Sequence, residues 1–118
     1  MERYRNFFRI EYPFEIRPIF SCQGENHEVF NVSEQGIKFA ITTKNSSLKV
    51  GNQIKGTVKF INPEDALNVC EVSGMILRKD SGECAIQLKD GIPWKKILTE
   101  QRYLIKRYGT FKQPDPIP

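Results

Sequence analysis

Two short motifs near the start of the chain carry side chains that suit an anionic ligand. One is an R-x-x-x-R run bounded by Arg5 and Arg9, and the other is an N-x-S-x-x-G run that holds Asn31, Ser33 and Gly36. A guanidinium stays charged at any working pH, and its planar fork fits a phosphate or the O6/N7 edge of guanine. An amide and a hydroxyl add short donors and acceptors, and glycine lets a ligand approach the backbone. These residues predict a site for a ligand that combines phosphate with a purine base.

Each motif on its own also has a plain structural interpretation. Two arginines four residues apart occur in many solvated basic segments, and Asn, Ser and Gly are ordinary residues of a turn between strands. If the second motif lies on a strand, Asn31 and Ser33 face the same side, because side chains alternate along a strand. The conjunction of the two motifs, rather than either one, therefore favours a binding site.

Length and composition indicate one globular domain. The chain has 118 residues, of which 39% are hydrophobic and 27% are charged, and a chain of this size buries a core of its own. Apolar stretches stay well short of the ~20 residues that a membrane span needs. The first residues lack the apolar segment of a signal peptide. We therefore expect a cytoplasmic protein without membrane insertion.

The net charge of +4 is unevenly distributed. Residues 95–112 hold six basic residues and one acidic residue, a net of +5, so the rest of the chain has a net of −1. This balance argues against a nucleic-acid footprint over the strands. The basic C-terminal segment is either a docking surface for an acidic partner or a solvated face that maintains solubility.

Alternating apolar residues predict about six short strands. Residues 12–22 alternate throughout and are interpreted as one strand, with its two prolines at an edge or a bulge. Gly24 to His27 is interpreted as a turn. Further alternations, separated by turn residues, predict strands around residues 28–32, 37–41, 54–61, 70–76 and 84–88. Antiparallel pairing of such strands gives a barrel.

The last element has a different period. From Trp94 to Tyr108 the apolar residues follow helical spacing, with Pro93 suited to the start of a helix and Gly109 to its end. We expect this amphipathic helix to cover one opening of the barrel with its basic residues facing solvent. The proline-rich tail, residues 113–118, is expected to be disordered.

The cysteines and the single histidine have structural interpretations. Cys22, Cys70 and Cys84 form no close pair, so a disulfide framework is disfavoured and buried thiols are expected. A zinc site that adds His27 is the alternative, although structural zinc ligands usually come in close pairs. His27 is interpreted as a turn residue. No nucleophile and base can be paired from one histidine, so we predict no catalytic residues, no metal site and no cofactor.

In order and spacing, ahead of a run of short strands, the two motifs resemble those of the PilZ domain, a bacterial family that binds the second messenger cyclic di-GMP. In that family the arginine motif opens the domain, and a D/N-x-S-x-x-G motif follows about twenty to thirty residues later. The resemblance covers the chain from Arg5 to about Tyr108. It implies an all-β fold with one helix, a PilZ-type antiparallel barrel of about six strands closed by a C-terminal amphipathic α-helix.

The resemblance also implies roles for the motif residues. Arg5 and Arg9 would bind the phosphates and Hoogsteen edges of the guanines. Asn31 and Ser33 would contact a guanine from the barrel, and Gly36 would keep the ligand-facing turn open. Many members of the family carry Asp at the position of Asn31, and a neutral amide offers both a donor and an acceptor there.

The segment before the barrel forms an N-terminal arm, residues 1–11, followed by the barrel and helix at 12–112. We expect the arm to be mobile when empty and to order on the nucleotide. In the family, an arginine directly before the motif favours a ligand dimer. This chain has Tyr4 at that position, which points to one nucleotide, with Arg3 and Tyr4 as additional candidate contacts.

The resemblance implies a receptor or adaptor, and not an enzyme. Cyclic di-GMP, a ligand rather than a cofactor, would order the arm and present a changed surface to an unidentified protein effector. Such proteins control motility, pili, exopolysaccharide synthesis or biofilm formation. Two alternatives stay open. One is a PilZ-fold adaptor that binds protein without nucleotide, and the other is a small barrel that binds single-stranded nucleic acid through a basic groove with exposed aromatic residues.

Overall fold

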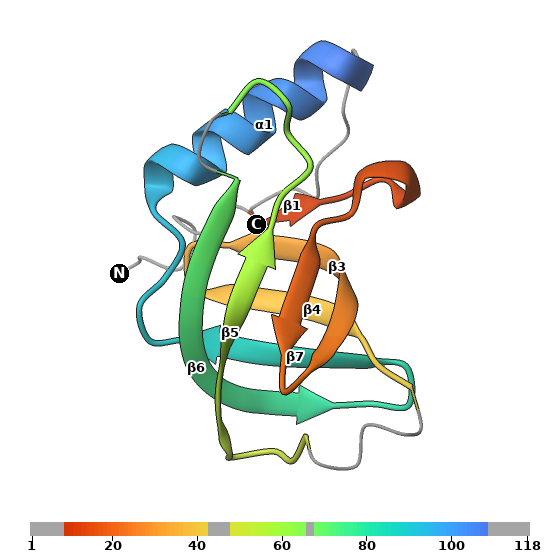
Figure 1. The fold of residues 1–118 in the computed structure, drawn as a ribbon, viewed down its shortest axis with the longest axis vertical. Coiled ribbons are helices and arrows are strands. Elements are labelled where there is room, and N and C mark those ends of the chain that lie inside the picture. The colour runs from red at the N-terminus through yellow and green to blue at the C-terminus, as the bar shows by residue number, and fades with distance from the viewer. Residues whose placement is uncertain (1–8, 43–47, 66–67, 109–118) are drawn as a thin grey trace, which may run out of the picture.

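The structure, a computed structural model, describes residues 9–42, 48–65 and 68–108. Arg3, Tyr4, Arg5, Gly109 and the tail at 113–118 lie outside the described residues. In chain order, the elements are β1 (Ile10–Glu11), the 3₁₀ helix η2 (Phe14–Ile16), β2 (Ile19–Cys22), β3 (Glu25–Ser33), β4 (Gly36–Ala40), β5 (Gln53–Lys59), β6 (Val69–Lys79), β7 (Glu83–Leu88) and α1 (Trp94–Tyr108). Figure 1 shows the strands forming one body with α1 lying across its upper end.

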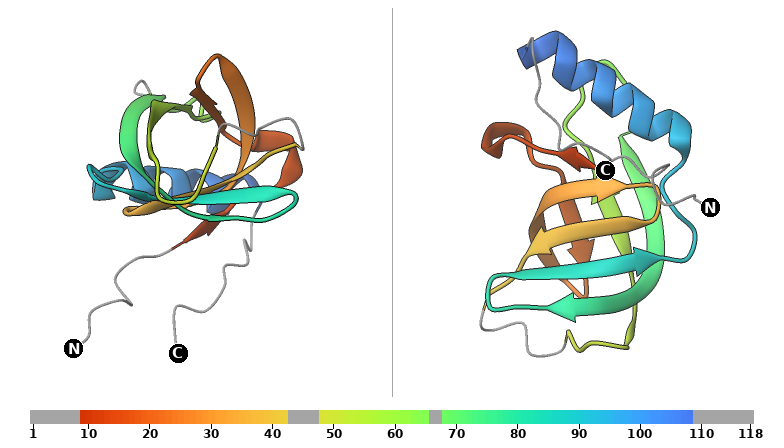
Figure 2. Two further views of the ribbon diagram at one scale, coloured as in Figure 1. Left: turned by 90° about the horizontal axis from the view of Figure 1, so that it is seen from below. Right: turned by 180° about the vertical axis from the view of Figure 1, so that it is seen from behind.

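Six strands close into an antiparallel barrel. Neighbouring strands follow the order β3-β2-β5-β6-β7-β4, and β4 pairs back with β3, which completes the ring. β1 adds a short pairing on β3, where Ile10 lies opposite Val32. Figure 2 shows the ring of strands from below and from behind. The expected antiparallel barrel of six strands with one C-terminal helix is therefore confirmed.

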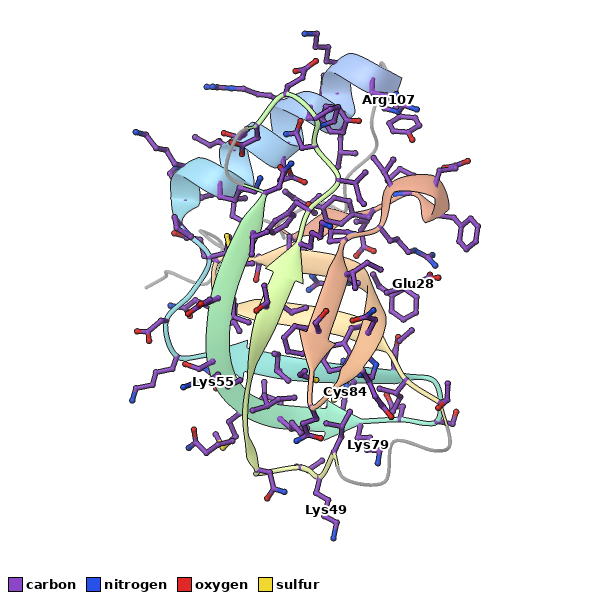
Figure 3. The ribbon with its side chains drawn as sticks, viewed as in Figure 1. Glu28, Lys49, Lys55, Lys79, Cys84 and Arg107 are labelled. Carbon is purple, nitrogen blue, oxygen red and sulfur yellow. The ribbon has the colours of Figure 1, made fainter. Side chains whose placement is uncertain are left out.

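The inward side chains of the strands fill the barrel with one continuous core. Phe20, Phe39 and Val58 have no exposed surface, and the two buried thiols, Cys22 and Cys84, lie in the same cluster. Figure 3 shows the Cys84 sulfur within the ring of strands. Burial, together with nearby Cys84 and Glu25, raises the pKa of Cys22 to about 11. The thiol of Cys22 is therefore protonated at neutral pH and packs as a small apolar group.

The prediction of a single strand over residues 12–22 is wrong. β1 ends at Glu11, η2 follows, and β2 begins only at Ile19. Pro13 and Pro18 flank η2 and supply no N–H for a sheet ladder, so the pairing breaks between them. The alternation still has meaning, because Tyr12 and Ile16 are buried in the core.

His27 lies in the barrel interior and not in a turn, contrary to the sequence interpretation. The turn between β2 and β3 consists of Gln23 and Gly24 alone, both with positive φ (52° and 78°), as tight hairpins require. β3 therefore begins early enough to include His27, which is 6% exposed. Its Nδ1 lies 3.0 Å from the carbonyl oxygen of Ala40, and its ring centroid lies 5.0 Å from that of Phe39. No group of three or more metal-ligating side chains occurs among the described residues.

Helix α1 begins at the predicted residue, Trp94, and is helical through Tyr108, but the face that it buries differs from the prediction. Ile97 and Leu104 are fully buried as expected. Trp94, Ile105 and Tyr108 are instead 39%, 48% and 38% exposed.

No helix among the described residues is long and apolar enough to cross a membrane.

A buried ionic cluster fixes which side of α1 faces the barrel. Lys96, expected in solvent, is buried, and its Nζ lies 2.7 Å from Asp65 and 3.2 Å from Glu100. The same Nζ lies 4.5 Å from the centroid of the Phe60 ring. The Tyr12 hydroxyl donates to Glu100 at 2.7 Å. Burial, reinforced by Glu100, holds the pKa of Tyr12 well above its usual value, so this hydroxyl remains a donor.

Removal of the Lys96 charge should destabilise the fold strongly. Lys96→Ala leaves the carboxylates of Asp65 and Glu100 without their shared cation, and breaking a buried ion pair costs about 3–5 kcal/mol. The matched control is Lys95→Ala, one residue earlier and exposed, with an expected change within about 0.5 kcal/mol. Urea unfolding of both variants measures the difference. Equal stability of the two variants would contradict a structural role for the cluster.

Candidate functional site

A cleft on the outer surface of the barrel brings together most of the residues that the sequence singled out. It has a volume of about 360 Å³ and crosses β3, β4, β7 and β6. Arg9, Asn31, Ser33 and Gly36 all line it. Arg9 is exposed and stands directly before β1, whereas the other three come from β3 and β4. Three separate segments therefore contribute to one concave surface.

A β-bulge precedes the polar pair on β3. The pairing with β4 shifts between Val29, opposite Phe39, and Asn31, opposite Lys38, so Phe30 is the extra residue. After the bulge, Val32 points into the core with no exposed surface. Asn31 and Ser33, on either side of it, both line the cleft, as the alternation predicts.

The amide of Asn31 already has a partner. Its Nδ2 donates to Oε2 of Glu11 at 3.3 Å, and the side chain is largely buried. Glu11 belongs to β1 and follows Arg9 by two residues. The short strand that follows Arg9 is thus tied to the polar pair through a side chain as well as through the backbone pairing of Glu11 with Asn31.

Backbone hydrogen bonds from the end of β7 and from the connection between β7 and α1 hold the turn between β3 and β4 in place. The backbone N–H of Leu88 donates to the carbonyl of Gln35 at 2.9 Å, and that of Ile92 donates to the carbonyl of Glu34 at 2.9 Å. Gly91 packs so closely on this turn that an added Cβ would lie 1.8 Å from the Glu34 oxygen. The motif turn is therefore a fixed wall of the cleft.

Gly36, unlike Gly91, has room for an added Cβ atom. A Cβ added at Gly36 would lie 3.4 Å from the carbonyl oxygen of Ile86 and 3.6 Å from Oγ of Ser33, which are ordinary contact distances. Its backbone is not in the left-handed region that favours glycine. The fold itself does not require a glycine at this position, and its missing side chain leaves the surface of the cleft open.

The cleft also contains residues that the sequence analysis missed. Lys38 on β4, together with Leu77 and Arg78 on β6, lines it beside the motif residues. Three cations, Arg9 among them, and no carboxylate stand among the described lining residues. Lys38 lies 3.6 Å from Glu83, and Arg78 lies 3.7 Å from Asp80. The Arg78–Asp80 pair is exposed and the Lys38–Glu83 pair is half-buried, and solvent-accessible pairs of this kind contribute little to stability. The alternation of side chains along its strand could have predicted that Lys38 faces outward. The position of Arg78, by contrast, depends on the pairing of β6 with β7.

A second cleft, of about 630 Å³, is larger but less suited to an anion. Its lining includes two carboxylates, Glu25 and Glu28. Its cation is Arg17, whose guanidinium lies 5.2 Å and 4.8 Å from the ring centroids of Phe14 and Phe30. The same guanidinium lies 3.2 Å from Glu28. Arg17 therefore stabilises its own neighbours, and we take the smaller, cationic cleft as the candidate site.

Comparison with known proteins identifies the fold. No family model and no curated protein matches the sequence. Among solved structures, the PilZ domain of YcgR from Escherichia coli, described with c-di-GMP, matches with a TM-score of 0.68 and 12% identity over 92% of this chain and 100% of that chain. The Bacillus subtilis inhibitor of motility MotI/DgrA matches with a TM-score of 0.63 and 12% identity, over 95% of this chain and 55% of that chain. The chain is thus a PilZ-like domain by fold.

Two glycine substitutions should separate the fixed wall from the open surface. Gly91→Ala drives a methyl group into the Glu34 carbonyl and should destabilise the fold by about 1–3 kcal/mol, as overpacking does. Gly36→Ala meets only ordinary contacts and should change stability by less than about 1 kcal/mol. Thermal and urea unfolding of the two variants provide the test. A Gly36→Ala variant as unstable as Gly91→Ala would mean that Gly36 serves the fold.

Proposed function

We propose that this protein is a cyclic di-GMP receptor that passes a ligand-dependent change to a protein effector. The observation that carries the proposal is the convergence of Arg9, Asn31, Ser33 and Gly36 on one cationic cleft. A ligand with two phosphates and two guanines offers partners to guanidinium, amide and hydroxyl groups at once. The YcgR domain of the same fold is described with c-di-GMP, which supports the choice of ligand.

Each residue has a role that its chemistry supports. Arg9 grips a phosphate or the Hoogsteen edge of a guanine, and Arg5 on the same arm does the same for the other half of the ligand. Asn31 and Ser33 contact a guanine edge from the barrel, and Gly36 leaves room for the nucleotide against the sheet. Arg3 and Tyr4 are additional candidate contacts on the arm.

The Glu11–Asn31 hydrogen bond gives the site a switch between two arrangements. A nucleotide that uses the Asn31 amide competes with the Glu11 carboxylate, and its phosphates repel that carboxylate. β1 would then shift with the arm. Tyr12 follows Glu11 directly and donates to Glu100 of α1 at 2.7 Å, so a shift of β1 reaches the helix. The changed surface that the effector recognises includes α1 in this proposal.

The effector is an unidentified protein. MotI is described as an inhibitor of motility, so motility is the first process to examine, ahead of pili, exopolysaccharide synthesis or biofilm formation. No enzymatic step and no cofactor is part of the proposed mechanism. The protein acts by binding alone.

Calorimetric titration with cyclic di-GMP tests the proposal. The wild type should bind saturably with one nucleotide per site, and Arg9→Ala should weaken binding by about 1–3 kcal/mol, the value of a bidentate contact with guanine. The melting temperature should stay unchanged, because Arg9 is exposed. The matched control is Arg102→Ala, which removes an exposed arginine from α1 and should bind like the wild type.

Three outcomes of this titration, and one of a separate titration with oligonucleotides, are informative. Equal affinity of Arg9→Ala and the wild type would remove Arg9 from the site. A stoichiometry of two would show that Tyr4 does not limit the site to one nucleotide. No binding by folded protein at high micromolar ligand would leave a PilZ-fold adaptor that acts without nucleotide, and steeply salt-dependent binding of oligonucleotides would instead support the nucleic-acid alternative.

A further inference from the structure

A β-bulge in β6 turns two consecutive side chains toward the same cleft. Ile76 lies opposite Ile86 on β7, but the next pair is Arg78 with Ala85, so Leu77 is an extra residue. Along a regular strand, one of two adjacent side chains would point into the core. Here Leu77 is 52% exposed, the Arg78 side chain is 61% exposed, and both line the cleft. Bulges re-aim side chains in this way and are frequent beside functional sites.

The bulge lies across the cleft from the motif residues. The strands follow the order β3, β4, β7, β6 around this side of the barrel. Three strand spacings therefore separate Asn31 from Arg78, roughly 14 Å along the sheet at about 4.8 Å per spacing. One guanine with its phosphate, held at Asn31 and Ser33, does not need so wide a surface. One molecule of a cyclic dinucleotide, however, has a second base to place.

The chemistry of the pair suits a purine base. Leu77 is a large, exposed apolar side chain that lines the cleft, where it offers a surface for the flat face of a ring. Arg78 lies 3.7 Å from Asp80, and both side chains are more than half exposed, so this weak pair leaves the guanidinium available. A guanidinium fork matches the O6 and N7 acceptors of guanine, whereas adenine presents an amino donor in place of O6.

We propose that the Leu77–Arg78 bulge is a second base subsite, in which Leu77 packs on the ring and Arg78 selects guanine over adenine. The inference deepens the proposed function, since it rests on a cyclic dinucleotide occupying the cleft. Arg9, Asn31 and Ser33 then hold one half of the ligand, and the bulge holds the other. The bulge thus adds guanine selection at the second base to the contacts proposed for the motif residues.

Affinities for cyclic di-GMP and cyclic di-AMP, measured by calorimetry on four variants, test the subsite. Arg78→Ala should lose about 10- to 100-fold in cyclic di-GMP affinity and little for cyclic di-AMP, so the ratio between the two ligands falls. Arg78→Lys keeps the charge without the fork and should retain part of the affinity while losing most of the discrimination. Leu77→Ser should weaken both ligands alike. Arg102→Ala on α1 is the control for the loss of an exposed arginine.

The failure of this inference is distinguishable from the failure of the proposed function. A wild type that does not bind cyclic di-GMP overturns both. A wild type that binds, with Arg78→Ala no weaker than Arg102→Ala and an unchanged ligand ratio, overturns the subsite and leaves the receptor intact. Backbone amide shifts of Leu77 and Arg78 during titration of the wild type give a reading that needs no variant to fold. Unperturbed β6 amides in a saturated complex also overturn the subsite.

Discussion

Closure of the barrel through β4 is the constraint on which the rest of the structure depends. β4 pairs with β3 on one side and with β7 on the other, and these two pairings complete the ring. The candidate site lies on the outside of this closure, across β3, β4, β7 and β6. Without β4 in place, the polar pair on β3 and the bulge on β6 would lie toward opposite sides of an open sheet. The same hydrogen bonds that remove the sheet edges therefore assemble the cleft.

Two bulges and one fixed turn give the cleft its shape. Phe30 is the extra residue of β3 before the polar pair, and Leu77 is the extra residue of β6 on the far side. Between them the Glu34–Gln35 turn is held by backbone hydrogen bonds from Leu88 and Ile92. The fold itself therefore holds the sheet part of the candidate cleft in place. In the proposed function, this preorganisation limits the entropy that binding has to offset.

β1 connects the candidate site with the helix that covers the barrel. Glu11 accepts a hydrogen bond from Asn31 in the cleft, and the next residue, Tyr12, donates one to Glu100 of α1. Glu100 also lies 3.2 Å from Lys96, whose second partner is Asp65. A buried cluster of charges has few alternative arrangements, because every partner left alone is costly. In the proposed switch, a shift of β1 would therefore act on a helix whose orientation this cluster defines.

The sequence by itself determined most strands of the barrel, the presence of the helix and the motif residues, because local apolar periods distinguish strands from helices. It also predicted that Asn31 and Ser33 share a face. It misplaced His27 and Lys96, and it treated residues 12–22 as one strand. Only the tertiary structure decided these points and the exposure of Leu77 and Arg78. The buried ion pair joins Lys96 to Asp65, 31 residues earlier in the chain, and the bulge in β6 depends on pairing with β7. A local apolar period contains neither of these partners.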